Sequence, residues 1–255
     1  MPPIAGSLAG SLAGRGGGSL AGGANTIAAL AGASLRAHYR GDAFEEGAGG
    51  APDAETANDL HSSGLYDATN LTQSQQPHSG DVLGFPALEF SKAAARGLTA
   101  SGVAMNAIND DMTTMCVFKR NSAIAGTEVA FQAGVSGFND GINIFFGVSQ
   151  GLRVRFGTAA SLETIDTAFS DTAAYHVVRG TTNAAGVTSS LDGAATLDAG
   201  TFNGIAAACT DIDLGRSVAG SSPGDVTIAE AVVMVNPTAA QVSGVEDFLI
   251  AKYGV

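Results

Sequence analysis

Hydrophobic positions in the second half of the chain fall into short runs that are separated by turn residues. The runs are rich in Val, Ile, Phe and Thr, and Gly, Asn or Asp stands between them. They lie at residues 112–118, 128–133, 142–148, 152–156, 175–178, 187–191 and 228–235. Runs of this length and composition are typical of strands in an antiparallel sandwich. We therefore predict an all-β fold.

Two local patterns add detail to this sandwich. Asp192-Gly193 is flanked by apolar residues, and an Asp-Gly pair is the strongest short-range signal for a hairpin turn. Residues 153–156 read Arg, Val, Arg, Phe, so the two arginines share one face of a strand and the apolar pair shares the other. We expect a hairpin at 191–194 and one sheet face that is polar.

Only the end of the chain has the pattern of a helix. Asn236 suits the N-cap position, and Pro237 suits the first helical position. Lys252 and Gly254 suit the C-terminal end, the first through the helix dipole and the second as a left-handed cap. Four apolar residues then recur on one face: Val242, Val245, Phe248 and Leu249. The sequence predicts a single short helix that closes the sandwich.

The first 34 residues differ from the rest of the chain because they contain a short sequence motif that is repeated. Gly-Ser-Leu-Ala-Gly occurs at 6–10, 10–14 and 18–22. Such a segment is either a flexible linker or an extended arm whose leucines dock on a partner. The leucines of the predicted arm are Leu8, Leu12, Leu20 and Leu30. We predict an extended Gly/Ala/Ser/Leu docking arm over 1–34 and a folded domain over 35–255, with residues 27–44 apolar enough to enter the core.

Charge and composition exclude several classes of protein. The 255 residues carry a formal net charge of −12, which disfavours binding to nucleic acid and to anionic lipid. A chain with 45% hydrophobic and 14% charged residues is expected to fold. No apolar stretch reaches the ~18 residues of a membrane span, and the N-terminus lacks the basic region of a secretory signal. Cys116 and Cys209 are expected to be buried apolar residues.

Several segments resemble the laminin-G-like, concanavalin A-like jelly-roll domains of phage virion proteins and secreted bacterial proteins. Residues 225–234 are similar to the closing strand of that family, and residues 245–254 are similar to its terminal helix. Shorter matches lie at residues 75–77, 85–90, 191–193 and 214–216, so the resemblance covers 58–255. The chain departs from the family in lacking tryptophan. The resemblance implies a concanavalin A-like jelly-roll sandwich.

Sequence patterns for catalysis are absent. The chain has no Glu-x-Asp-x-x-Glu strand of a glycoside hydrolase, the nearest segment being 163–166. It has no Gly-x-Ser-x-Gly elbow and no phosphate-binding loop. Its histidines do not stand at metal-binding spacing; they are His38, His61, His78 and His176. We predict a protein that is not an enzyme and has no catalytic or cofactor-binding residues.

Calcium is the one cofactor that the sequence suggests. Jelly-roll lectins commonly hold this ion in loops, and clustered oxygens are the ligands that it prefers. The candidates are two acidic loops, with Asp110 and Asp111 in the first and Asp140 and Asn143 in the second. Asp and Asn are also common in ordinary turns, so a turn without metal is the alternative.

The resemblance and the arm together suggest a structural protein of a tailed-phage virion. In this interpretation the jelly roll faces outward as a capsid decoration or a head or tail accessory protein. The arm anchors it to other virion subunits, and the protein forms a homo-oligomer. It would assemble in the host cytoplasm, without a signal peptide.

The alternative function is a lectin-like module that binds host-surface glycans from a tail or fibre. The fold supports carbohydrate binding at loops or on an open sheet face. Arg153 and Arg155 together with Asn143 would supply a polar face for such binding. Sugar-binding surfaces usually also present exposed aromatic rings, and this chain has no Trp and only four Tyr.

Overall fold

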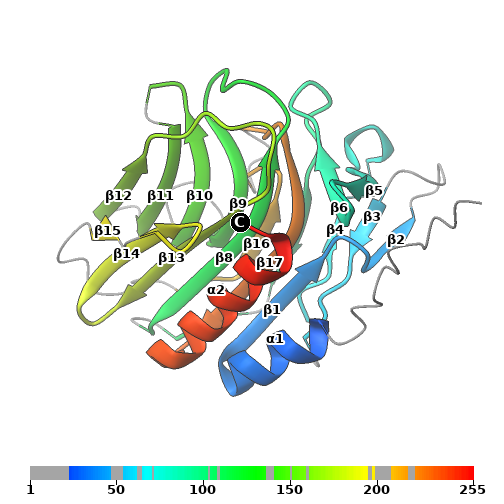
Figure 1. The fold of residues 1–255 in the computed structure, drawn as a ribbon. Coiled ribbons are helices and arrows are strands. Elements are labelled where there is room, and N and C mark those ends of the chain that lie inside the picture. Colours follow the sequence, from blue (N-terminus) through cyan, green and yellow to red (C-terminus); the bar gives the residue numbers. More distant parts are fainter. Residues whose placement is uncertain are drawn as a thin grey trace, which may run out of the picture.

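The chain folds into two antiparallel β-sheets that pack face to face, with two helices on the outer surface of one of them (Figure 1). The computed structural model describes residues 23–46, 54–61, 65–70, 72–102, 104–107, 110–135, 141–149, 151–158, 161–194, 197–198, 208–217 and 222–255. The antiparallel β-sandwich with a C-terminal helix that the sequence predicts is confirmed.

The first sheet has eight strands and lies against the helices. Its order is β15-β14-β13-β8-β17-β6-β5, and β1 pairs with β17 beside β6. Every pairing within it is antiparallel. The strands are β1 (Leu35–Arg40), β5 (His78–Val82), β6 (Phe85–Phe90), β8 (Met112–Arg120), β13 (His176–Asn183), β14 (Gly186–Leu191), β15 (Leu197–Asp198) and β17 (Val226–Val235).

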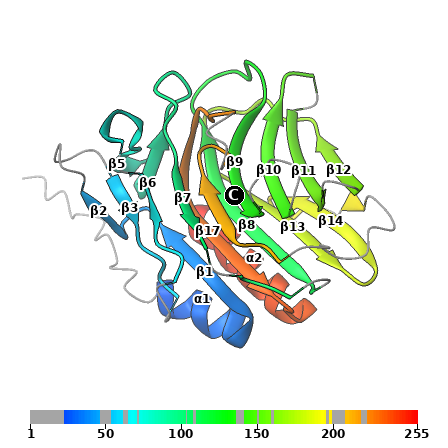
Figure 2. The same cartoon turned by 180° about the vertical axis from the view of Figure 1, so that it is seen from behind.

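The second sheet has nine strands and covers the other side of the core (Figure 2). Its order is β12-β11-β10-β9-β16-β7-β4-β3-β2. The strands are β2 (Phe44–Glu46), β3 (Ala54–Ala57), β4 (Ala68–Thr69), β7 (Leu98–Ser101), β9 (Glu128–Gly134), β10 (Gly141–Gly147), β11 (Gly151–Thr158), β12 (Ser161–Thr167) and β16 (Asp211–Leu214). Among the described residues there are also two short 3₁₀ turns, η1 (Gly32–Ser34) and η2 (Gln73–Gln75).

All seven predicted strands are present, and so is the predicted hairpin. Asp192 and Gly193 have φ values of 52° and 66°, and the N–H of Ala194 donates to the carbonyl of Leu191 at 2.9 Å. Two consecutive positive φ values are those of a type I′ turn, whose twist matches that of the flanking strands. This turn joins β14 to β15.

The C-terminal helix is present as α2 (Ala239–Tyr253), but its N-cap differs from the prediction. Thr238, not Asn236, is the N-cap, and it forms a reciprocal capping box with Gln241. A threonine cap with glutamine at the third helical position satisfies two backbone N–H groups at once. Gly254 ends the helix with a φ of 72°, as predicted.

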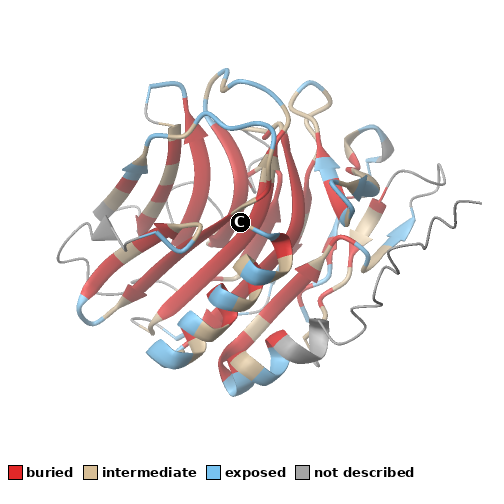
Figure 3. Cartoon of the chain, in the orientation of Figure 1, coloured by how far each residue is buried: buried red, intermediate tan, exposed pale blue. Residues whose placement is uncertain are grey.

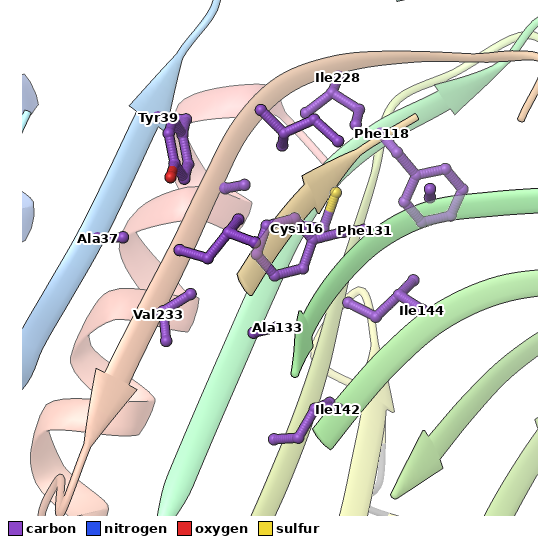
Figure 4. Close-up of a cluster of buried hydrophobic side chains, with 14 of the residues drawn as sticks. Ala37, Tyr39, Cys116, Phe118, Phe131, Ala133, Ile142, Ile144, Ile228 and Val233 are labelled. Atoms are coloured by element: carbon purple, nitrogen blue, oxygen red, sulfur yellow. The ribbon is translucent and has the colours of Figure 1, made fainter. Parts of the chain in front are cut away.

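The main hydrophobic core lies between the sheets, and the central strands that line it are buried along most of their length (Figure 3). Phe131 and Ile144 from the nine-stranded sheet meet Cys116, Phe118 and Val233 from the eight-stranded sheet (Figure 4). A second cluster lies between the eight-stranded sheet and the helices, and includes Val232, Val245 and Leu249. The central strands of the eight-stranded sheet are therefore buried on both faces, which explains why residues 228–235 are apolar at every position except Glu230.

Part of the predicted arm forms a helix, so the prediction of an extended segment over 1–34 is wrong for its last third. α1 (Gly23–Ala31) lies beside α2, and Ile27 and Ala31 are fully buried in the second cluster. Leu30 is half-buried and packs on the same cluster, close to Gly244. Apolar side chains in this segment gain more by packing on the sheet than by remaining solvated. Leu8, Leu12 and Leu20 lie outside the described residues.

Both cysteines are buried and unpaired with each other, as the sequence predicts. Burial raises the pKa of the Cys116 thiol well above its ordinary value. Within the part of the chain that the structure describes, neither helix has the length and hydrophobicity that crossing a membrane requires.

Candidate functional site

A polar cleft of about 220 Å³ opens on the outer surface of the eight-stranded sheet, beside the start of α2. Strands β13 and β14, the chain before β8 and the first turn of the helix form its walls. Its lining residues are Asp111, Arg179, Thr181, Asn183, Thr188, Pro237, Ala239 and Val242. The cleft thus sets hydrogen-bonding groups on the strands against an apolar wall on the helix.

Arg179 is held at the inner wall of the cleft by a buried ion pair. Its Nη1 lies 2.8 Å from Oε2 of Glu246 on α2, and both side chains are about nine-tenths buried. The hydroxyl of Ser190 donates to the other oxygen of the same carboxylate. The arrangement fixes the guanidinium and balances its charge, because a buried charge is tolerated only when it is paired.

The sequence does not predict this ion pair, although the position of Glu246 indicates that it needs a buried partner. It stands four residues after Val242 and three before Leu249, both of which are buried on the sheet-facing side of α2. A carboxylate on the apolar stripe of a helix must find a buried partner. The partner itself, Arg179, is 67 positions away and cannot be read from spacing.

The mouth of the cleft is fixed by hydrogen bonds between two loops. Asn236 donates through Nδ2 to Asp110 at 3.0 Å and accepts from the N–H of Asp111 at 3.1 Å. The N–H of Ala107 donates to the second oxygen of Asp110 at 2.7 Å. Asn236 adopts a φ of 51°, a conformation that Asn tolerates better than most residues. Asn236 therefore ties the chain before β8 to the chain before α2.

The calcium candidates fall in three different settings. Both oxygens of the Asp110 carboxylate accept the loop hydrogen bonds just described, whereas Asp111 lines the cleft. Asn143 lies on β10 in the other sheet and is fully buried, and Asp140 lies outside the described residues. No group of three or more His, Cys, Asp or Glu in the described ranges could hold a metal ion. Calcium binding stays a prediction.

The polar face suggested by the sequence exists on the nine-stranded sheet. Asn143 pairs with Arg155, and both arginines lie over the ring of Phe145, with Cζ at 5.4 Å for Arg153 and 4.8 Å for Arg155. Arg153 also forms an ion pair with Asp166 at 2.6 Å. Asn143 and Phe145 are almost completely buried, however, so only the arginine end of this face is open to solvent.

A histidine and a glutamate form a second buried cluster that has the composition of a catalytic pair. Nε2 of His38 lies 2.6 Å from Oε1 of Glu230, and Lys252 and Tyr253 bind the other oxygen at 2.6 and 2.9 Å. His38 and Glu230 are both at most 1% exposed. Their position joins β1, β17 and the end of α2, so the cluster fastens the helix to the sheet out of reach of a substrate.

His176 is the first residue of β13 and lies between two carboxylates. Nδ1 lies 2.7 Å from Asp192 and Nε2 lies 3.4 Å from Asp171. Burial alone would lower the pKa of His176, but the two carboxylates outweigh it and raise that pKa above its ordinary value. This contact ties the predicted hairpin turn to the loop that precedes β13.

None of the four tyrosines forms an exposed ring. Tyr39, Tyr66, Tyr175 and Tyr253 are all buried, between 2% and 8% exposed. The large apolar side chains that the described part of the chain exposes are Leu65, Leu83 and Val148. No tyrosine therefore offers an exposed ring for stacking on a ligand.

Comparisons with known proteins find solved structures that have a similar fold. No protein-family model and no curated protein matches the sequence. The structure is similar to a Trypanosoma rangeli sialidase in complex with 2,3-difluoro-KDN, with a TM-score of 0.60, 14% identity, 86% of this chain covered and 33% of the sialidase chain covered. It is also similar to the binding domain of botulinum neurotoxin DC, solved in complex with rat synaptotagmin II.

The neurotoxin match has a TM-score of 0.57 and 12% identity, and covers 86% of this chain and 52% of the toxin chain. A structure of botulinum neurotoxin type C, whose cell entry depends on interaction with two ganglioside molecules, gives the same TM-score at 11% identity. This chain thus spans about a third of the sialidase and about half of the toxin fragments. At such identities the similarity shows a concanavalin A-like sandwich and nothing finer.

Proposed function

We propose that this domain is a carbohydrate-binding module that has no catalytic activity, and that the cleft beside α2 is its sugar site. The observation that carries the proposal is the cleft itself, where polar groups on β13 and β14 face aliphatic carbon on α2. The solved structures with similar folds support the same class of function, since the sialidase is in complex with 2,3-difluoro-KDN and cell entry of neurotoxin type C depends on gangliosides. Both ligands are carbohydrates or carry them.

The chemistry of the cleft suits a sugar ring. Hydroxyl groups of a sugar donate to the carboxylate of Asp111 and accept from Arg179, while Thr188 can do either. The C–H face of a ring packs on Pro237 and Val242. A volume of about 220 Å³ lies below the ~300–1,000 Å³ of clefts that enclose drug-sized ligands. The cleft therefore accommodates one terminal ring of a glycan.

We also propose that the domain catalyses no reaction, because its catalytic-like side chains lie where a substrate cannot reach them. The His38–Glu230 pair is the arrangement most similar to catalytic machinery, and it is buried beneath α2. The carboxylates of Asp111 and Glu246 have different tasks, since the second is already bound to Arg179. A binding role needs neither a nucleophile nor a paired acid and base.

A glycan array probed with the full chain tests this proposal. We expect binding to a subset of glycans, reduced at least tenfold in Thr188→Met, whose longer side chain fills the cleft. Thr164→Met is the matched control, because Thr164 is a half-buried threonine on β12 of the other sheet. The absence of binding to any glycan, or equal losses in both variants, would contradict the proposal.

A second proposed function is attachment to a virion, which the repeated Gly-Ser-Leu-Ala-Gly motif in residues 1–22 favours. In this proposal the arm binds a capsid or tail subunit, and the sandwich displays its cleft toward host glycans as a homo-oligomer. Removal of residues 1–22 should prevent incorporation into particles and leave α1 and the sandwich folded. Normal incorporation of the truncated chain would refute it.

A further inference from the structure

The charges around the cleft carry an inference about which sugars it takes, which rests on the proposed function. Arg179 is the cation in the lining, and Glu246 neutralises it at 2.8 Å within the same wall. Asp111 is the remaining charge, and no hydrogen bond or ion pair between described residues engages its half-buried carboxylate. The lining together with Glu246 therefore carries a net negative charge.

The fold leaves little room for Arg179 to turn toward an acidic ligand. Glu246 is only 8% exposed, and its second oxygen already accepts the hydroxyl of Ser190. If the guanidinium left this carboxylate, a buried anion would lose its counterion, which is strongly unfavourable. Arg179 is thus a positioned hydrogen-bond donor for a hydroxyl or carbonyl oxygen, with its charge already compensated.

The start of α2 offers an anion fewer donors than an uncapped helix would. The capping box engages the N–H groups of Thr238 and Gln241, at 2.8 and 3.3 Å, and so removes two donors from the first turn. The whole chain adds a charge of −12 to the approach of any ligand. Like charge disfavours an anion both at long range and at the site.

We infer that the cleft binds neutral sugar rings and discriminates against rings that carry a carboxylate, such as sialic and uronic acids. Asp111 is the residue that sets this specificity. It accepts hydrogen bonds from two neighbouring hydroxyl groups of a neutral ring and repels a carboxylate in the same place. A bound ligand covers this half-buried carboxylate, and an acceptor that is covered without a donor is penalised, so glycans that lack the hydroxyls lose affinity.

Matched glycan pairs test the inference. The full chain is titrated with lactose and 3′-sialyllactose, and with glucose and glucuronic acid, which differ only in the carboxylate at C6, by calorimetry at low salt. We expect at least a tenfold preference for the neutral member of each pair that binds. Asp111→Asn should reduce this preference to about threefold or less, whereas Glu89→Gln, which removes an exposed carboxylate on β6, should retain it.

The outcomes separate the inference from the function on which it rests. A preference for the acidic member, or an unchanged preference in Asp111→Asn, overturns the inference and leaves glycan binding intact. Failure to bind any of the four sugars, together with a silent glycan array, overturns the proposed function itself. Circular dichroism of Asp111→Asn establishes that a loss of binding is not a loss of fold.

Discussion

His38 and Glu230 lie 2.6 Å apart with both side chains excluded from solvent. Burial alone would raise the pKa of Glu230, but the hydrogen bond and charge of His38 and the charge of Lys252 outweigh it and lower that pKa. The carboxylate is therefore ionised in the folded protein and accepts donors from β1 and from the last turn of α2. This contact ties the last turn of α2 to one residue of β17.

Glu230→Gln should destabilise the protein by about 3 kcal/mol at neutral pH, since breaking a buried ion pair leaves its partners uncompensated. The pKa of Glu230 is lower in the folded state, so its contribution is present above its unfolded pKa of about 4.3. It is lost as the pH falls through the folded pKa. Urea titrations at pH 7 and pH 3 measure the difference, which should shrink at pH 3. An equal difference at both pH values would contradict this account.

His176 should titrate above the ordinary range of histidine. Its pKa is raised in the folded state, so the stability it contributes is complete below about pH 6.5 and is lost as the pH rises through the folded pKa. Asp192→Asn keeps an oxygen for the N–H of Val177 and tolerates the positive φ, but removes the charge. The NMR titration of the His176 ring should shift downward in this variant. An unchanged midpoint would show that Asp192 does not set it.

Gly215→Ala should destabilise the fold by at least about 2 kcal/mol. Gly215 has a φ of 75°, and a Cβ there would overlap the ring of Phe90 in the main core. Gly80→Ala on β5 is the control, because a Cβ at that position meets nothing within 4 Å. Thermal unfolding of both variants measures the contrast. A Gly215→Ala variant as stable as Gly80→Ala would refute the close approach of Gly215 to the Phe90 ring.

Both thiols should be inert in the native state. Cys116 and Cys209 have no exposed surface, and burial raises the pKa of Cys116. Because the thiolate is the reactive form, Ellman's reagent should label neither residue until denaturant is added, and then label both. Rapid labelling of the folded protein would indicate that the core opens locally.

The sequence predicts those parts of the fold that depend on local pattern. The strands with dense apolar runs and the Asp-Gly turn are visible because each is specified by neighbouring residues. Strands β2, β3 and β4 are only two to four residues long and carry no such run. α1 escaped prediction because its Gly/Ala-rich composition continues that of the repeats before it. Its helical form depends on packing against α2 and the sheet.

The cleft could not be predicted because its residues meet only through tertiary structure. Thr181 and Thr188 are brought together by the pairing of β13 with β14. Asp111 lies beside them only because β8 pairs with β13 and because the segment before β8 is hydrogen-bonded to Asn236. The sequence suggests Asp111 as a calcium ligand, and the structure places it in the wall of a cleft. Oxygen-rich loops have the same sequence signal for both roles.

The central claim is that a sugar binds in the cleft between β13, β14 and α2. Its most direct test is NMR, in which the amide spectrum of the full chain is followed during a titration with lactose and with N-acetylglucosamine. The account predicts that the shifted amides cluster at Thr181, Asn183, Thr188 and Ala239. Shifts that cluster instead around Arg153 and Arg155 on the nine-stranded sheet would contradict it, as would a spectrum that neither sugar changes.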